Sequence, residues 1–481
     1  MIERRGLRGL GLVVVLSLIF ASCDGREEPP RPGEERSPGA SPTSERARVI
    51  GLVGTMSGSG SWRGTDAFEG ADLGVSVLNR GADEEDETFE LVTLDDEGDP
   101  ARATELIEEL ARSERTAGII HAGSAEALPP ADDTLALAGV PGVLIYGDLY
   151  SARLLRGHLF QMSPPALWQG RRIATYLGTD RDYDVVAVVA DRSVTGEGAV
   201  DSLKAAVADT RGLRATVRRY ETPDDLARIL QKLRRARAEA IVFQGGPVAF
   251  SVLLESLAEM DATYRGTRRA RWASLPPGQR NRKNRAIWSP QIVGLDGVMA
   301  PQAGTDLPPG TIASETYARG VDYMPVPSFR RFADRFDDWW ATAPHGAELR
   351  AYEAVQMIGW AARRAEPDED VALALEEIEG ERFGGLDIVL GPDDHVAPGQ
   401  TTIGLWVVPG PRDDVRESRE RLAEMPWVPL ARGFSTDGRR TDILPPDWRY
   451  LFRDPPPPEA PAPRFSRMRF GVTTGRRDPL H

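Results

Sequence analysis

From Val49 onward, short apolar runs alternate with stretches of helical periodicity. The runs at 49–54, 89–96, 117–123 and 141–148 predict strands, and the stretches at 68–79, 101–113 and about 129–138 predict helices between them. Strands and helices in this order are typical of βαβ units, in which a parallel sheet is covered by helices. The pattern therefore predicts a first α/β lobe.

The same alternation begins again after about 160. The runs at 185–191, 215–221 and 239–246 predict strands, and the stretches at 196–209, 224–237 and 248–260 predict helices. Apolar strands are expected where helices cover both faces of a parallel sheet. Further helices are expected at 327–342 and 348–364, and further strands at 386–390 and 402–408. We expect an α/β fold of two doubly wound parallel-sheet lobes joined by a hinge.

The lobes are expected to exchange chain segments. Lobe 1 is predicted to consist of 47–162 plus about 290–395, and lobe 2 of 163–289 plus about 396–410. Residues 411–481 contain the run DPPPPEAPAP and are predicted to be a largely irregular, proline-rich extension. Residues 23–46 are rich in Pro, Ser and Glu and predict a disordered tether.

The amino terminus has the layout of a secretory signal, with arginines before an apolar run from Leu10 to Phe20 and small residues before Cys23. The run is short for a membrane span. Residues 1–22, ending in Phe20-Ala21-Ser22, resemble a bacterial lipoprotein signal, with Phe20 in the place where Leu is usual. The resemblance implies that Cys23 carries a lipid anchor. The alternatives are an ordinary cleaved signal and an uncleaved anchor.

Composition narrows the function. With 59 basic and 73 acidic residues the net charge is -14, which argues against nucleic acid as a partner. The single cysteine and the scattered histidines give no metal-binding spacing, so no metal is expected.

The first glycine-rich turn offers a candidate cofactor site. Gly58, Gly60 and Gly64 form G-x-G-x-x-x-G, one residue longer than the dinucleotide fingerprint, and Asp95 or Asp96 lies where a ribose-binding carboxylate would. An exported protein meets no pool of reduced nicotinamide. There is also no G-x-S-x-G motif, so we expect no enzyme, no catalytic residue and no cofactor.

A resemblance covers about 48–410. The segments VGTMSGSGSWRGTDAFEGADLGVSVLN, LDDEGDPARATELIEEL, ADRSVTGEGAVDSLKAA, AYEAVQMIGWAARRA and FGGLDIVLGPDDHV resemble, in this order, the branched-chain amino-acid-binding (leucine-binding) solute-binding proteins of ABC transporters, a type I periplasmic binding protein family. This resemblance implies that a small solute binds in a cleft between the lobes and that ABC permease subunits are partners.

In open parallel sheets, ligands bind beyond the carboxyl ends of the strands, so the turns that follow strands supply the candidate site. These residues are Ser57, Trp62, Arg63, Gly123, Ser124, Tyr146, Gly147, Asp148, Asp191, Thr195 and Gln244. The resemblance implies that Gly123 and Ser124 present a backbone N–H and a hydroxyl to a ligand carboxylate. The alternatives are that Ser57 caps a helix, that Trp62 packs the lobe and that Asp191 caps a turn.

The chain departs from the family at several of these positions. Arg63, beside Trp62, stands where the family has an aromatic residue, and Thr195 stands where it has a tyrosine. The family's acid that pairs with the ligand ammonium would fall in 272–279, which contains no acidic residue. Asp148 and Asp191 are the replacements we expect, with Arg63 for a carboxylate, and they favour a zwitterionic or cationic solute. The alternative is that both aspartates cap turns at the rim.

Two other features have structural explanations. The segment 265–285 carries eight basic residues and no acid, and we interpret it as a solvated loop rather than a docking site. Phe336, Trp339 and Trp340 lie at helical spacing and are interpreted as core rather than as a sugar platform.

The sequence thus predicts a lipid-anchored extracytoplasmic protein that captures a small polar solute for an ABC importer. The alternative is a ligand-sensing or cell-surface interaction protein on the same fold. Neighbouring permease genes would favour transport, and a neighbouring sensor kinase would favour sensing.

We predict that Cys23→Ser releases the protein from membranes or blocks its processing, because no thiol remains to carry the lipid. Membrane fractionation and the mass of the processed chain measure this. Unchanged processing and membrane association in the variant would exclude lipidation at Cys23.

Overall fold

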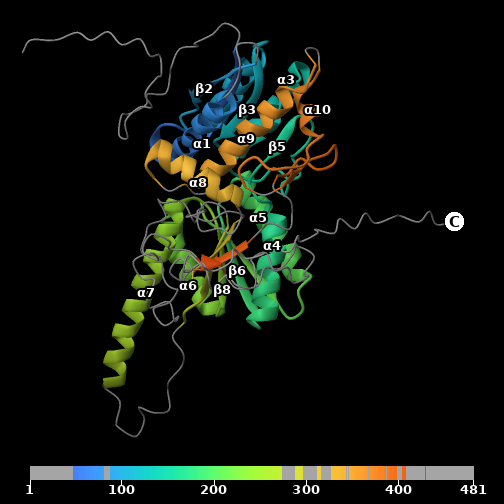
Figure 1. Cartoon of the computed structure of the whole chain (residues 1–481). Helices are drawn as coiled ribbons and strands as arrows, with labels where there is room; N and C mark the ends of the chain where they lie inside the picture. Colours follow the sequence, from blue (N-terminus) through green and yellow to red (C-terminus); the bar gives the residue numbers. More distant parts are fainter. Residues whose placement is uncertain are drawn as a thin grey trace, which may run out of the picture. The chain divides into compact units, whose positions relative to one another are not determined.

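The computed structural model describes residues 47–80, 87–273, 288–295, 311–315, 327–342, 344, 346–366, 369–385, 387–397, 404–407 and 428–429. Within these residues the chain forms two parallel sheets, each covered by helices on both faces (Figure 1). The predicted fold class is therefore confirmed. In this part of the chain no helix is both long enough and apolar enough to cross a membrane.

The first sheet has five parallel strands in the order β2-β1-β3-β4-β5. They are β1 (Arg48–Gly54), β2 (Phe89–Asp95), β3 (Thr116–Ala122), β4 (Gly142–Leu144) and β5 (Leu159–Gln161). One face packs against α1 (Ser61–Asn79) and α9 (Gly346–Ala362), and the other against α2 (Pro100–Ala111) and α3 (Leu128–Ala138). β3 is buried along its whole length, as expected for a strand covered on both faces.

The second sheet has the order β14-β13-β10-β9-β8-β6-β7. Its parallel strands are β6 (Val185–Ala190), β7 (Arg214–Arg219), β8 (Ala240–Gln244), β9 (Gln291–Gly294) and β10 (Ile312–Glu315). Helices α4 (Ala166–Thr175) and α5 (Val194–Ala208) cover one face, and α6 (Asp225–Ala236) and α7 (Pro247–Ala273) cover the other. The edge strand β7 reads RATVRR, and its arginines suit an edge that would otherwise invite strand pairing.

The second sheet extends further along the chain than we expected. We assigned about 290–395 to lobe 1, but β9 pairs in parallel with β8, and β10 pairs with β9. The reason is that Ile292 and Val293 bury apolar side chains in the second lobe's core, where the connection after α7 returns the chain to the same sheet. The chain rejoins the first lobe by α8 (Pro327–Trp340), whose phenylalanines pack against α1 and α9.

The carboxyl-terminal part adds antiparallel strands to the second sheet. β13 (Gly404–Val407) pairs with β10, in the segment where a strand was predicted. β14 (Val428–Pro429) pairs with β13 and falls within the extension that is predicted to be largely irregular. The predicted signal 1–22 and tether 23–46, with Cys23, lie outside the described residues.

The remaining elements complete the first lobe. They are the short helix α10 (Val371–Leu375) and the hairpin of β11 (Glu379–Glu381) and β12 (Ile388–Val389). Phe336 is fully buried on α8, and the indole N–H groups of Trp339 and Trp340 donate to Asp72 and to the Glu69 carbonyl of α1, at 2.9 and 3.0 Å. The interpretation of these aromatic residues as core is confirmed. The basic segment begins in helix rather than loop, because α7 continues to Ala273.

Helices α1 and α9 lie side by side (Figure 1) and approach closely because α1 carries glycines on the shared face. A Cβ on Gly70 would lie 2.1 Å from the carbonyl oxygen of Glu348, and one on Gly74 would lie 2.9 Å from the Val355 side chain. The first of these contacts is with backbone, which has little freedom to move away. Gly70 therefore fixes the distance between two helices that cover the first sheet.

We predict that Gly70→Ala lowers the free energy of unfolding by about 1–3 kcal/mol, because the added methyl group forces α1 and α9 apart. This loss would appear despite the higher helix propensity of alanine. Urea unfolding measures it, with Gly391→Ala as the control because its Cβ would meet nothing within 4 Å. Equal stability of the two variants would show that α1 is free to shift.

Candidate functional site

A pocket of about 180 Å³ lies where turns after the strands of both sheets meet. Its first-lobe wall comes from the start of α1 and from the turns after β3 and β4, and its second-lobe wall comes from the turns after β6 and β8. The lining residues are Trp62, Arg63, Gly123, Ser124, Ala125, Tyr146, Gly147, Asp191, Ser193, Thr195, Gln244, Gly245 and Gly246. The volume is below the range of drug-sized sites and suits a small solute.

The position of the pocket follows from strand order. β1 has β2 on one side and β3 on the other, and β6 likewise has β7 and β8. The connections that leave β1 and its neighbour β3 therefore run in opposite directions, as do those that leave β6 and β8, and this opens a crevice between the carboxyl ends of each pair. Both crevices contribute residues to the pocket.

Aromatic side chains hold a cation in the first-lobe wall. The Trp62 and Tyr146 rings meet edge to face, with centroids 5.3 Å apart, and the Tyr146 hydroxyl donates to Asp66 at 3.2 Å. The Arg63 guanidinium carbon lies 5.2 Å from the Trp62 ring centroid and 5.9 Å from that of Tyr146. Arg63 is half-buried, and its position depends on rings that are themselves fixed.

The turn after β3 is held in place by the buried side chains of His121 and Asp96. His121 is fully buried, with Nε2 2.8 Å from the Ser124 carbonyl oxygen and Nδ1 3.0 Å from that of Val53. A Cβ on Gly123 would lie 2.3 Å from Oδ2 of Asp96, so glycine is the residue that fits there. The Ser124 hydroxyl accepts from the Glu126 N–H at 3.4 Å. The turn therefore presents a fixed backbone to the pocket.

The second-lobe wall contains a carboxylate that is already engaged. Oδ1 of Asp191 accepts from the N–H and the hydroxyl of Ser193, at 3.1 and 2.5 Å, and the Ser193 hydroxyl in turn caps α5 by accepting from Gly196. A Cβ on Gly245 would lie 1.8 Å from the Tyr220 hydroxyl oxygen. Burial, and to a smaller extent the Asp191 charge, raises the pKa of Tyr220, so its phenol stays protonated.

Two hydrogen bonds join the walls beside the pocket. The Val194 N–H, in the first turn of α5, donates to Oε1 of Glu126 at 3.1 Å. The Asp148 N–H donates to the Thr195 hydroxyl at 3.3 Å. A carboxylate at a helix N-terminus is favourable, so the first of these contacts stabilises the approach of the two walls.

All the predicted site residues except Ser57 and Asp148 line this pocket. Ser57 is exposed, and its side chain forms no cap on the helix that follows it. Ala125, Ser193, Gly245 and Gly246 were not predicted. Each lies within two residues of a predicted site residue, and this proximity is the signal that could have found them.

The expectation for Asp148 was wrong. The side chain is 2% exposed, and its oxygens accept from the N–H groups of Ser151 at 2.8 Å and of Ala166 at 2.6 Å. The carboxylate thus accepts the first N–H of α4 and closes the turn at 148–151 behind the pocket. A buried carboxylate binds free N–H groups that lie near it. Of the two expected carboxylates, only Asp191 faces the pocket. Residues 274–279, most of the segment where the family's acid would fall, lie outside the described residues.

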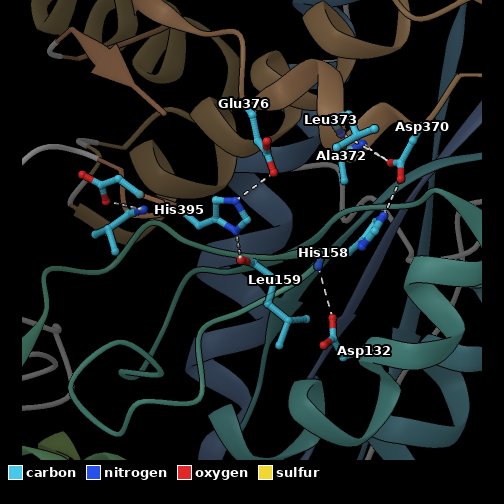
Figure 2. A network of polar contacts seen from close by, with 10 residues as sticks. Asp132, His158, Leu159, Asp370, Ala372, Leu373, Glu376 and His395 are labelled. Carbon is cyan, nitrogen blue, oxygen red and sulfur yellow. Dashed lines mark hydrogen bonds and ion pairs between the residues drawn. The ribbon is translucent and has the colours of Figure 1, made fainter. Parts of the chain in front are cut away.

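Two histidine–carboxylate pairs form a separate network around β5 (Figure 2). Nε2 of His158 lies 2.5 Å from Oδ2 of Asp370, and Nε2 of His395 lies 3.1 Å from Oε1 of Glu376. Asp370 and Glu376 flank α10, so the histidines hold the ends of this short helix against the first sheet. None of these residues lines the pocket, and we interpret the network as structural. No group of three or more potential metal ligands occurs among the described residues.

Comparison with known proteins identifies relatives of this chain. A family described as "Periplasmic binding protein" matches residues 49–407. The Leu/Ile/Val-binding protein homolog 3 of Brucella melitensis is 26% identical over 203 residues, which are 41% of this chain and 54% of the relative. The chain therefore aligns with about half the length of that relative.

Solved structures share the fold. The branched-chain amino-acid transporter substrate-binding protein LivJ from Streptococcus pneumoniae, in complex with isoleucine, gives a TM-score of 0.59 at 18% identity, covering 76% of this chain and 96% of that chain. A solute-binding protein of an ABC transporter from Rhodopseudomonas palustris, in complex with 3,4-dihydroxybenzoic acid, gives a TM-score of 0.59 at 16% identity, covering 77% and 94%. At these identities the likeness establishes the fold.

We predict that Asp148 gives the stability of the protein a specific pH dependence. Burial raises the pKa of Asp148 above 3.8, so ionisation disfavours the folded state relative to the unfolded state. This contribution to stability is present below pH 3.8 and is lost as the pH rises through the raised folded-state value. Wild-type protein should therefore lose stability relative to Asp148→Asn as the pH rises.

Urea unfolding of both proteins between about pH 4 and 7 measures this difference. Asp133→Asn, at an exposed position of α3, serves as the control and should follow wild type. A difference that stays constant, or that moves in favour of wild type with rising pH, would show that the N–H donors outweigh burial.

Proposed function

Because the chain belongs to the periplasmic binding protein family, we propose that it captures a small polar solute, such as an amino acid or an amide, between its lobes. It delivers this solute to the permease of an ABC importer. It works outside the cytoplasm, held to the membrane by the lipid on Cys23. Its family consists of substrate-binding proteins rather than enzymes.

The pocket carries the proposal. Turns of both sheets enclose a small volume, and the lining combines backbone, hydroxyl, amide and charged groups with two aromatic rings. Polar groups at fixed positions orient a small molecule, and enclosure from two sides removes water from their contacts. This arrangement suits reversible capture, which needs complementary contacts and no reacting group.

The charges of the lining support a zwitterionic solute over a cationic one. Arg63 stands in one wall and Asp191 in the other. The second carboxylate that would have favoured a cation, Asp148, is occupied behind the pocket. Isoleucine and 3,4-dihydroxybenzoic acid, the ligands of the two structural relatives, share a carboxylate, which fits a cation in the site.

We predict that a bound solute raises the melting temperature and makes the protein more compact, because binding favours the folded, closed state. A thermal-shift screen over amino acids, amides, short peptides and sugars identifies the solute. Small-angle scattering then measures compaction, and hydrogen exchange measures protection in the turns at 123–124 and 191–198.

The turn at 211–212 follows α5 and does not line the pocket, so its exchange is the internal control. A solute that raises the melting temperature but leaves 123–124 and 191–198 as exposed as before would place the binding site elsewhere.

A further inference from the structure

The two charged side chains of the pocket, Arg63 and Asp191, differ in how many hydrogen bonds they form within the protein. Asp191 accepts two hydrogen bonds from Ser193 within its own turn. Arg63 forms no hydrogen bond or ion pair with any residue that the structure describes, and its Nε atom is buried without a hydrogen-bond partner. Its guanidinium lies near the Trp62 and Tyr146 rings, which attract a cation without forming a conventional hydrogen bond with it.

The place of Arg63 in the fold makes this charge more costly. It lies in the first turn of α1, where the helix dipole is positive and a cation is unfavourable. Burial removes part of its hydration, and enclosure of a solute removes more. A half-buried guanidinium at a helix N-terminus therefore lowers the stability of the folded protein when no anion is bound.

From these observations we propose that Arg63 selects the solute by binding its carboxylate, and that an ammonium group on the solute is dispensable. The proposal rests on the proposed function and names the chemical class of the solute. The guanidinium offers a planar fork that matches the two oxygens of a carboxylate, and an ion pair with a solute would compensate its charge. Asp191 needs no ammonium from the solute, because its own turn already supplies two donors.

The aromatic rings position this group. The Tyr146 hydroxyl donates to Asp66, and the Trp62 ring meets the Tyr146 ring edge to face. The two rings therefore hold the guanidinium in the pocket wall, beside the turns after β3 and β4. A fixed guanidinium loses less freedom when a carboxylate binds. Arg63 is then the residue that distinguishes an acid from the corresponding amide of the same shape.

The test uses matched pairs of probes on full-length protein. Leucine, 4-methylpentanoate and leucinamide share one skeleton, and 3,4-dihydroxybenzoate and 3,4-dihydroxybenzamide share another. Calorimetry gives the dissociation constant of each probe for wild-type protein, Arg63→Gln, Arg63→Lys and the control Arg112→Gln. Arg112 is an exposed residue after α2, and its replacement removes the same charge away from the pocket.

For wild type and Arg112→Gln we expect the carboxylates to bind at least about tenfold more tightly than the amides, with 4-methylpentanoate close to leucine. Arg63→Gln should weaken carboxylate binding by about 30-fold or more and leave amide binding little changed, whereas Arg63→Lys should lie between. The ratio between acid and amide is the informative quantity, because a merely structural role of Arg63 would weaken both probes alike.

The outcomes separate this proposal from the proposed function. Equal affinities for acid and amide in wild type, or an unchanged ratio in Arg63→Gln, would overturn the carboxylate site while solute capture stands. Failure of all carboxylates to bind wild type would also overturn it. If the amides and the wider solute screen fail as well, the proposed function falls with it.

Discussion

Parallel strand pairing is the constraint on which the pocket depends. In a parallel sheet every strand runs in the same direction, so the turns that leave β1, β3 and β4 gather at one edge, as do those that leave β6 and β8. The helices that return the chain cover both faces, so a solute binds at the carboxyl ends of the strands rather than on a face of the sheet. Polar groups from segments far apart in the sequence therefore meet without any long loop.

Glycine lets these turns approach one another. A Cβ on Gly123 would meet Asp96, one on Gly196 would meet Asp191 at 2.2 Å, and one on Gly147 would lie 3.0 Å from the Thr195 hydroxyl. Gly147 also has a φ of 91°, which a residue with a side chain rarely adopts. The absence of side chains at these points lets the carboxylates and the backbone come close enough to fix the shape of the pocket.

The fold was predictable because its signal is local, whereas the side-chain directions were not. Alternating strand and helix periods gave β1 to β4, β6 to β8, β13 and most of the long helices, but not β5, β9, β10 or β14. The rule that ligands bind beyond strand ends gave most of the pocket lining. The short strands β9 and β10 gave no clear period, and so 291–294 and 312–315 were assigned to the wrong lobe. Asp148 follows a strand end as Asp191 follows another, but the backbone N–H of Ala166, which accounts for its direction, is distant in sequence.

The carboxylates and the arginine around the pocket also show two different uses of buried charge. Asp96 accepts from the Thr55 hydroxyl and the Gly98 N–H, at 2.8 and 2.7 Å, and Asp148 accepts from two further N–H groups. These hydrogen bonds inside the protein offset part of the cost of burying the carboxylates and fix the turns around them. A cation in the first turn of a helix costs about 0.3–1 kcal/mol instead. Arg63 has ring contacts but no hydrogen bond with any described residue, so the unfavourable free energy of its position is offset when an anion binds. Occupancy of the pocket is therefore coupled to the stability of the first lobe.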